Sequence, residues 1–529
     1  MRSADAAPPG PAGAQRGLDR SDIAALAGLA MALGALGFGL FNHDFSVNGL
    51  RYADDVERGL ALFHPNHLLP NLLYRGAWLA AQVAGLGGLR AIWLMQAINV
   101  GAGLVVAVSV ARIALAHGGR DRAVLIGALY ACGFAAWNFA EEPDVYILPA
   151  AAVAASLALL LARSRLGWGA VGALAVLGVF AVLTLQQYVF WYPALLALVA
   201  ARDLGTARRS KLLLLALGVP LACLLAYVVA GALQGRLHGA NDVAGWFLGY
   251  AWSDHTGFAT YRPAPGWLPR LLGAALGLGN LAVAYEVILS PATVVVAAIA
   301  GTALLLVVLR TARFFGGAAA GVRRDATIIG LWCVANLAFA TWWESRNIEF
   351  LFPVWVGGAA LAALATAALE RRLLAVTVLL VGGVNLAAAF WPQHDWPQRY
   401  RVAEALARHE RLARDDVLIT EELNTIGYLH YFARTDVRFQ PGAVSAAMQA
   451  SLPVAQARAE IDAALAAGAR VYTTEIDEQG RLREIARWFA PLGRSGFDGA
   501  VDHDIAALYR GLDLSAQPVP GARRVTAPH

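Results

Sequence analysis

A succession of long apolar runs fills most of the first 391 residues of this chain and limits how it can fold. Of the 529 residues, 58% are hydrophobic and only 15% are charged, which excludes an ordinary soluble globular protein. Since a helix needs about 20 mostly apolar residues to cross the hydrocarbon core of a bilayer, we predict an α-helical polytopic membrane protein with about eleven transmembrane helices plus interfacial helices. The expected spans are 22–41, 91–115, 123–139, 146–162, 169–186, 188–201, 212–233, 285–309, 326–343, 350–370 and 373–391.

Residues 68–88 are apolar but contain Pro70, Asn71 and Arg75, so we predict a helix lying at the interface rather than a span. With this segment left out of the count and the N-terminus in the cytoplasm, most loop arginines lie inside, as the positive-inside rule requires. The inside loops are then 117–122, 163–167, 201–211, 310–325 and 370–372. The outside loops, which carry the acids, histidines and aromatics, are 42–90, 140–145, 234–284 and 343–349. The net charge of +5 reflects these loop arginines, and we expect no nucleic-acid partner.

The composition changes after residue 391, where strands and helices begin to alternate without a further apolar run. Strands at 415–420, 436–440 and 469–475, with helices between them, indicate a small α/β domain with a largely parallel sheet. A further helix is expected at 481–489 and a last strand at 503–510. The expected units are a cytoplasmic disordered N-terminus (1–20), a transmembrane module (21–391) with a first extracytoplasmic loop (42–90), an extracytoplasmic soluble α/β domain (392–513) and a disordered tail (514–529). We expect the first apolar run to be retained as a span rather than removed as a signal peptide.

The first outside loop holds the densest polar cluster of the chain, with the adjacent acids Asp54 and Asp55 followed by His64 and His67. Charges cost several kcal/mol inside lipid, so this cluster should lie at the membrane surface or line a wet cavity. Adjacent carboxylates can take different roles, one as a general base and one holding a metal or a substrate hydroxyl. The alternative is a solvated loop whose acids favour the start of an interfacial helix.

Further polar groups follow on the same predicted face, and we expect them to converge with the first cluster on one extracytoplasmic cavity. They are Glu141, Glu142, Asp144 and Tyr146 in one loop, Gln186 and Gln187 at the end of a span, and Glu344, Arg346 and Glu349 in a late loop. Each has a simpler alternative: solvated loop acids, buried amides that need partners, and an Arg346 that pairs with a neighbouring glutamate instead of a phosphate. The three cysteines lie inside apolar runs and support neither a disulfide framework nor a cysteine metal site.

These features together resemble the GT-C superfamily of integral-membrane glycosyltransferases, and within it the protein O-mannosyltransferase-like, polyprenyl-phosphate-sugar-dependent branch. The likeness covers roughly residues 20–390. The matching residues are Asp54–Asp55, His64–Pro65, Trp137 with Asp144-Val145-Tyr146, Gln186–Gln187 with Pro193, and Glu349-Phe350 to Pro353. The chain departs from the usual pattern in having Asp-Asp instead of Asp-Glu, and Asn66 instead of a second proline.

The resemblance implies a hexosyl- or pentosyltransferase that moves a sugar from a polyprenyl-phosphate-linked lipid donor to a hydroxyl of a lipid, glycan or protein acceptor, with inversion. Asp55, or failing that Asp54, would be the catalytic base. The donor phosphate and sugar would contact His64, His67, Arg346, Glu349 and Gln187, and the acceptor or sugar would contact Glu141, Glu142, Asp144 and Tyr146. These residues establish no cofactor; a divalent cation is left open, and Asp54 and Asp55 would hold it.

A membrane transporter or flippase is the main alternative. It would explain intramembrane polar groups, but such proteins place them near the bilayer centre, often on broken helices in repeated halves. Here the acids gather at one face and no repeat is evident. A non-catalytic scaffold whose soluble domain binds an envelope partner is a second alternative.

Overall fold

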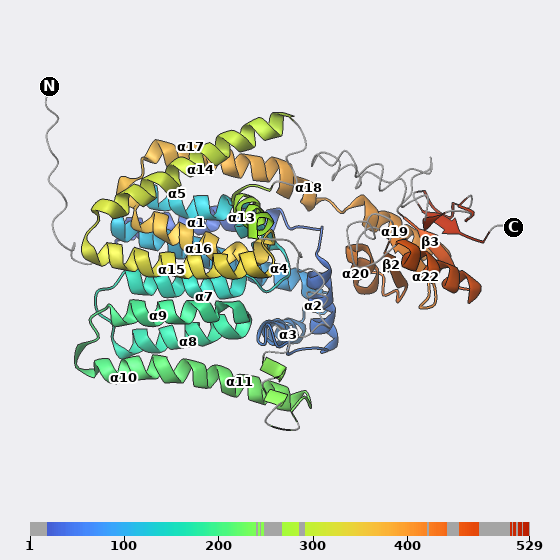
Figure 1. The fold of residues 1–529 in the computed structure, drawn as a ribbon, viewed down its shortest axis with the longest axis horizontal. Helices are drawn as coiled ribbons and strands as arrows, with labels where there is room; N and C mark the ends of the chain where they lie inside the picture. Colours follow the sequence, from blue (N-terminus) through green and yellow to red (C-terminus); the bar gives the residue numbers. More distant parts are fainter. Residues whose placement is uncertain are drawn as a thin grey trace.

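The computed structural model describes residues 18–237, 239, 242–243, 245–247, 267–284, 291–420, 423–441, 454–474, 508–509, 512–514, 517–520 and 522–527. It consists of a large helical bundle followed by a small α/β domain at one end of the bundle (Figure 1). The described part of the chain begins at the opposite end of the bundle (Figure 1). The predicted disordered segment 1–20 lies almost wholly outside the described residues.

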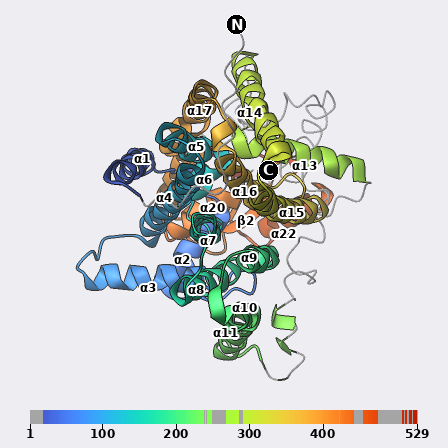
Figure 2. The same cartoon turned by 90° about the vertical axis from the view of Figure 1, so that its left-hand side faces the viewer.

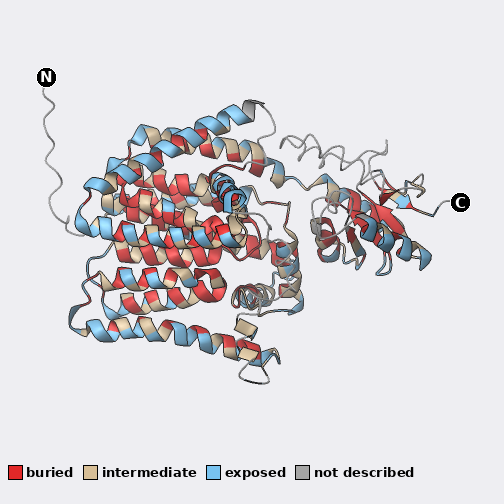
Figure 3. Cartoon of the chain, viewed as in Figure 1, coloured by how far each residue is buried: buried red, intermediate tan, exposed pale blue. Residues whose placement is uncertain are grey.

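Every predicted span has a helical counterpart. These are α1 (Arg20–Gly39), α4 (Ala91–His117), α5 (Arg120–Cys132) with α6 (Phe134–Glu141), α7 (Ile147–Leu161), α8 (Trp168–Thr184), α9 (Trp191–Ala200), α10 (Arg208–Leu213) with α11 (Val219–Leu233), α14 (Pro291–Gly317), α15 (Ala320–Trp343), α16 (Ile348–Leu364) and α17 (Arg371–Asn385). In the described part of the chain, six helical stretches are long and apolar enough to cross a membrane alone, and the bent α5–α6 pair makes a seventh. Helices α7, α8 and α16 are apolar but shorter. Buried residues concentrate on the inner helices and helix faces of the bundle, and exposed residues lie on the outer ones (Figure 3). The chain is an integral, multi-pass membrane protein.

The predicted span 123–139 is not one continuous helix, because the chain bends by 67° between α5 and α6. Gly133 lies at the break in an extended conformation (φ −64°, ψ 140°). A side chain there is excluded, since a Cβ atom would lie 2.4 Å from the ring of Trp355. The same indole donates a hydrogen bond of 3.1 Å to the Tyr130 carbonyl, which the break removes from the helical pattern.

Three helices lie across one end of the bundle: α2 (Val47–Arg58), α3 (Pro70–Val83) and α13 (Trp267–Ala282). Figure 2 looks along the bundle, and there α3 and α13 are seen from the side while the spans are seen end-on. Helix α3 agrees with the interfacial helix predicted within 68–88, and α13 belongs to the long aromatic loop 234–284. Residues 248–266 of that loop lie outside the described residues.

Contacts between loops assign them to the two ends of the bundle. At one end, Arg371 pairs with Asp121 at 2.9 Å and Arg120 with Asp22 at 3.3 Å. At the other end, where α2 lies, Ser46 N donates to Glu142 at 2.8 Å, which joins the first outside loop to the 140–145 loop. The grouping of arginine-bearing loops at one end and acidic loops at the other is therefore as predicted. That the arginine-bearing end faces the cytoplasm stays a prediction from loop charge.

The bundle continues through α18 (Trp391–His394) and α19 (Gln398–Glu410) into the small domain. Its strands are β1 (Val417–Thr420), β2 (Arg438–Pro441), β3 (Val471–Thr473) and β4 (Arg523–Val525), with α20 (Leu423–Tyr431) and α22 (Val454–Ala466) between them. The strand order is β2-β1-β3-β4; β1 runs parallel to β2 and β3, as predicted, and β4 is antiparallel to β3.

Residues 514–529 were expected to be a disordered tail, and this prediction is wrong for β4. Val525 is buried and pairs with Val471, so an apolar edge of the sheet is covered by the end of the chain. The helix predicted at 481–489 and most of the strand predicted at 503–510 lie outside the described residues.

Candidate active site

Helix α2 carries the acidic pair and is fixed at both ends by its own sequence. The Ser46 hydroxyl caps its start by accepting a hydrogen bond of 3.0 Å from Gly49 N, and Gly59 ends it in the left-handed conformation (φ 71°). Leu50, Ala53 and Val56, spaced at three-residue intervals, form its buried face. Since successive residues of an α-helix point about 100° apart, Asp54 and Asp55 face different surroundings.

Asp54 and Glu57 lie on the flank of α2 that faces the small domain. Asp54 forms ion pairs with Arg58 at 3.1 Å and with Arg434 at 2.7 Å. Glu57 pairs with Arg90 at 2.8 Å and with Arg434 at 2.6 Å. These contacts neutralise both acids, so Asp54 is poorly suited to take a proton from a substrate.

Asp55 lies on the other flank, together with Arg51 and Tyr52. Its carboxylate accepts no hydrogen bond and forms no ion pair among the residues that the structure describes. Partial burial raises the pKa of Asp55 to about 6; Arg51 opposes this rise and Asp54 adds to it. Of the two adjacent acids, Asp55 is therefore the one available as a general base.

His64 and His67 lie beside this flank with their rings stacked 4.2 Å apart. His67 Nε2 lies 3.0 Å from the Tyr52 hydroxyl, and His64 Nδ1 accepts a hydrogen bond of 3.2 Å from Asn66 N. Burial lowers the pKa of His64 to about 4 and that of His67 well below its usual value, and Arg51 contributes to both shifts. Both imidazoles are therefore neutral near pH 7 and can donate a hydrogen bond but supply no positive charge.

The turn after α6 packs directly against the start of α2. Besides the bond from Ser46, a Cβ at Gly49 would lie 2.6 Å from Glu142 Oε1, so only glycine permits this approach. Asn99 on α4 holds the turn by donating 2.7 and 2.8 Å bonds to the carbonyls of Glu142 and Asp144. Burial raises the pKa of Glu142 to about 7, despite the bond from Ser46.

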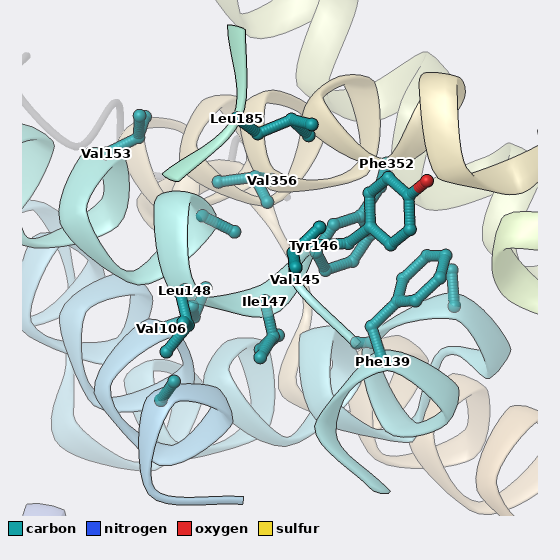
Figure 4. Packing of buried hydrophobic residues seen from close by; sticks show 14 of the residues in the cluster. Val106, Phe139, Val145, Tyr146, Ile147, Leu148, Val153, Leu185, Phe352 and Val356 are labelled. Carbon is teal, nitrogen blue, oxygen red and sulfur yellow. The ribbon is translucent and has the colours of Figure 1, made fainter. Parts of the chain in front are cut away.

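Asp144, Tyr146 and Glu349 bring a third segment to the same place. The Tyr146 hydroxyl donates to Glu349 Oε2 at 2.5 Å, which joins the start of α7 to the first turn of α16. Burial, with Glu349 and Glu142 nearby, raises the pKa of Asp144 well above its usual value. Figure 4 shows the Tyr146 ring beside Phe139 and Phe352, whose packing fixes the direction of its hydroxyl.

Three of the predicted residues, Glu141, Gln187 and Arg346, lie outside this group. Glu141 points into an apolar pocket lined by helices α1, α4, α5 and α6, where the Trp137 indole donates to it. Gln187 donates to the Phe350 carbonyl at 2.7 Å and to Asn336 at 3.2 Å, so its amide supports the start of α16.

Arg346 is exposed, and within the described part of the chain it forms no ion pair with Glu344 or Glu349. The alternative that Arg346 pairs with one of these glutamates is therefore not observed, and its guanidinium is available to an anion.

Asp54 and Asp55 are the residues named above that would hold a divalent cation. Their two carboxylates point to different flanks of α2, and arginines already neutralise Asp54. Among the described residues, no three His, Cys, Asp or Glu side chains are arranged to hold a metal ion.

Sequence reasoning missed several residues that shape the site, above all Arg51, Tyr52 and Asn99. The helical period gave a usable signal for Tyr52, which precedes Asp55 by three positions and must lie near its face. Asn99 gave none, since a single amide in an apolar span has many possible partners.

Comparison with known proteins rests on structure, because no family model and no curated protein matches the sequence. The crystal structure of ArnT from Cupriavidus metallidurans bound to undecaprenyl phosphate has a TM-score of 0.54 and 12% identity, over 96% of this chain and 98% of that one. Its apo form has a TM-score of 0.53 and 14% identity, over 95% and 97%. Arabinofuranosyltransferase AftD from Mycobacteria has a TM-score of 0.53 and 13% identity, over 97% of this chain and 40% of that chain.

The chain has the GT-C fold. The fold predicted from short motifs is thus confirmed, together with the polytopic helical architecture. The GT-C fold alone names neither a sugar nor an acceptor, because unrelated specificities share one scaffold.

Proposed function

We propose that this protein is a glycosyltransferase that moves a sugar from a polyprenyl-phosphate-linked donor to an acceptor hydroxyl, at the end of the bundle where α2 lies. The observation that carries this proposal is Asp55, a half-buried carboxylate without a hydrogen bond or ion pair among the described residues, on the helix whose start packs against the turn at Glu142. The fold supports it, because ArnT with a similar fold binds undecaprenyl phosphate.

In the proposed reaction, Asp55 removes the proton from the acceptor hydroxyl as its oxygen attacks the anomeric carbon. The bond between that carbon and the phosphate oxygen breaks on the opposite face, so the configuration inverts and polyprenyl phosphate leaves. A base with a pKa of about 6 is mostly ionised at pH 7 and still basic enough to accept a proton in the transition state.

The leaving phosphate needs hydrogen-bond donors and positive charge as its own charge develops. We assign the hydrogen bonds to His64 and His67, which are neutral, and the charge to Arg346 and Arg51. Both arginines are exposed and form no ion pair among the described residues. Arg51 lies one helical turn before Asp55, so a phosphate bound there would be held beside the base.

Glu142, Asp144, Tyr146 and Glu349 gather at the turn that packs against the start of α2, and we assign them to the sugar or the acceptor. Buried acids with raised pKa values donate as well as accept hydrogen bonds, as sugar hydroxyls require. We expect these four residues to select the sugar, whether hexose or pentose, and the acceptor class.

From the charge of the loops we propose an orientation with a cytoplasmic N-terminus, the transmembrane module 21–391, and the domain 392–513 outside. Thiol labelling of a cysteine introduced at Arg408 and another at Arg165, in sealed membranes, would test it. We expect an impermeant reagent added outside to label the first position only.

Sealed liposomes containing the protein and a radiolabelled polyprenyl-phosphate sugar separate transfer from transport. A glycosyltransferase releases polyprenyl phosphate and moves the label to an added acceptor in the inverted configuration. A transporter or flippase delivers the intact donor to the other leaflet without cleavage, and that result would overturn the proposal. The variant Asp203→Asn, at the opposite end of the bundle, is the matched control and should retain full transfer.

A further inference from the structure

Arg434, in the turn after α20 of the small domain, contacts both acids on one flank of α2. Its Nη1 lies 2.7 Å from Asp54 Oδ1 and its Nη2 lies 2.6 Å from Glu57 Oε2. We call these two ion pairs the Arg434 bridge. The Glu57 side chain is only 9% exposed, whereas Arg434 is 48% exposed, so both pairs are open to water on the arginine side. The bridge therefore ties the small domain to the helix that carries the acidic pair.

Helix α20 follows α2 along its whole length. At the first turn of α2, the Asn424 side chain accepts a hydrogen bond of 2.9 Å from Val47 N. In the middle, Gly427 packs so closely that a Cβ there would lie 3.1 Å from Leu50 Cδ1. At the last turn of α2, Arg434 contacts Asp54 and Glu57. The backbone of Arg434 is in the left-handed conformation (φ 53°), which is unusual for a residue other than glycine.

Glu57 connects the bridge to the rigid bundle. Its Oε1 accepts hydrogen bonds from Arg90 Nε at 2.8 Å, from Ala91 N at 2.9 Å and from the Tyr431 hydroxyl at 2.5 Å. Arg90 and Ala91 mark the beginning of α4, the long span that also carries the turn at Glu142 through Asn99. The rotation of α2 about its axis is thus held against α4 and against the small domain at once.

This rotation decides which carboxylate faces the site. We propose that Arg434 is a positioning residue: by holding Asp54 and Glu57 on one flank, it presents Asp55 to the other flank and makes the small domain a working part of the transfer site. The proposal rests on the proposed function of Asp55. Without the bridge, Asp54 keeps only Arg58 of its own helix, and the last turn of α2 loses its ion pairs with the small domain.

Steady-state transfer by the intact protein in lipid nanodiscs tests this with Arg434→Gln and Arg434→Lys. We expect Arg434→Gln to lower kcat about 10- to 100-fold, because a shift of about 1 Å in a reacting group costs up to 10²-fold. The KM for the polyprenyl-phosphate sugar should change less than about twofold, since His64 and Arg346 are untouched. Arg434→Lys should be intermediate, because an ammonium cannot contact two carboxylates as a guanidinium does.

Arg408→Gln is the matched control. Arg408 is an exposed arginine of the same domain that pairs with Glu404 within α19 and does not contact α2, so it should leave kcat unchanged. A wild-type kcat for Arg434→Gln, or a rise in KM without a fall in kcat, would overturn the proposal. If Arg434→Gln does not fold, Tyr431→Phe, which removes one bond to Glu57, should give a smaller fall in kcat with the same unchanged KM.

Amide hydrogen exchange of α2 keeps this inference distinct from the proposed function. We expect Arg434→Gln, but not Arg408→Gln, to speed exchange of α2 amides relative to those of α4. Absence of transfer by the wild-type protein would contradict the proposed function, while unchanged exchange in Arg434→Gln would contradict the bridge.

Discussion

The substitution Gly49→Ala should separate α2 from the turn that carries Glu142. The new Cβ would lie 2.6 Å from Glu142 Oε1 and 2.8 Å from Pro143 Cγ, where ordinary contacts are 3.4 Å or more, so α2 or the turn must move by roughly 0.5 to 1 Å. Alanine within a helix is otherwise favoured over glycine by up to about 1 kcal/mol. Overpacking costs about 1–3 kcal/mol, and the bond from Ser46 N to Glu142 is strained as well. We expect a net loss of about 1–2 kcal/mol in the free energy of unfolding.

Transfer activity should fall further than stability, by about 10²-fold, because the displacement moves α2, with Asp55, relative to the turn at Glu142. The measurement combines denaturant unfolding in detergent micelles with the transfer assay. Gly76→Ala, in the middle of α3, is the matched control, since nothing lies within 4 Å of its Cβ position. It should be as stable as wild type or slightly more so, and fully active. If Gly49→Ala behaves like Gly76→Ala in both measurements, the close packing of α2 on the turn has no functional role.

Three further predictions concern charge. Because the pKa of Asp55 is raised to about 6, kcat/KM should fall as the pH drops through 6, and Asp54→Asn should move this acid limb to lower pH by removing a neighbouring negative charge. The pKa of Glu142 is about 7 in the folded protein, above its unfolded value of about 4.5. The stability contributed by the neutral carboxyl is therefore complete below about pH 4.5 and is lost as the pH rises through 7. Glu142→Gln should flatten this pH dependence of the unfolding free energy. Asp325→Asn breaks the buried ion pair in which Arg202 donates two hydrogen bonds to Asp325, and it should cost about 3–5 kcal/mol of unfolding free energy. Asp203→Asn breaks the exposed pair with Arg165 and should cost less than about 1 kcal/mol.

Hydropathy and loop charge were sufficient to predict the helical bundle and the grouping of the acidic loops at one end. Both follow from what lipid excludes: long apolar helices must span, and arginines favour one side. The bend at Gly133 could not be predicted in this way, because it depends on Trp355, more than two hundred residues later, filling the place of a side chain. Strand β4 was missed because two of its three residues are arginines, and only its pairing with β3 makes it a strand.

Within the site, residue types indicated the chemistry but not the direction of each side chain. Glu141 and Glu142 are adjacent and equally acidic, yet Glu141 points into an apolar pocket and Glu142 accepts a hydrogen bond from Ser46 N at the start of α2. Asp54 and Asp55 differ in the same way. Asp54 contacts Arg434, which lies 380 positions away, and local sequence carries no information about such a contact.

The most direct test of this account is the single-turnover rate of transfer from a saturating polyprenyl-phosphate sugar by Asp55→Asn and by Asp54→Asn, both folded as wild type. Loss of a general base costs about 10²–10⁴-fold, and we expect this loss for Asp55→Asn. For Asp54→Asn, which removes one arm of the Arg434 bridge but leaves the base, we expect a loss of about tenfold or less. A rate for Asp55→Asn equal to that of the wild type, or a larger loss for Asp54→Asn than for Asp55→Asn, would contradict the assignment of the base.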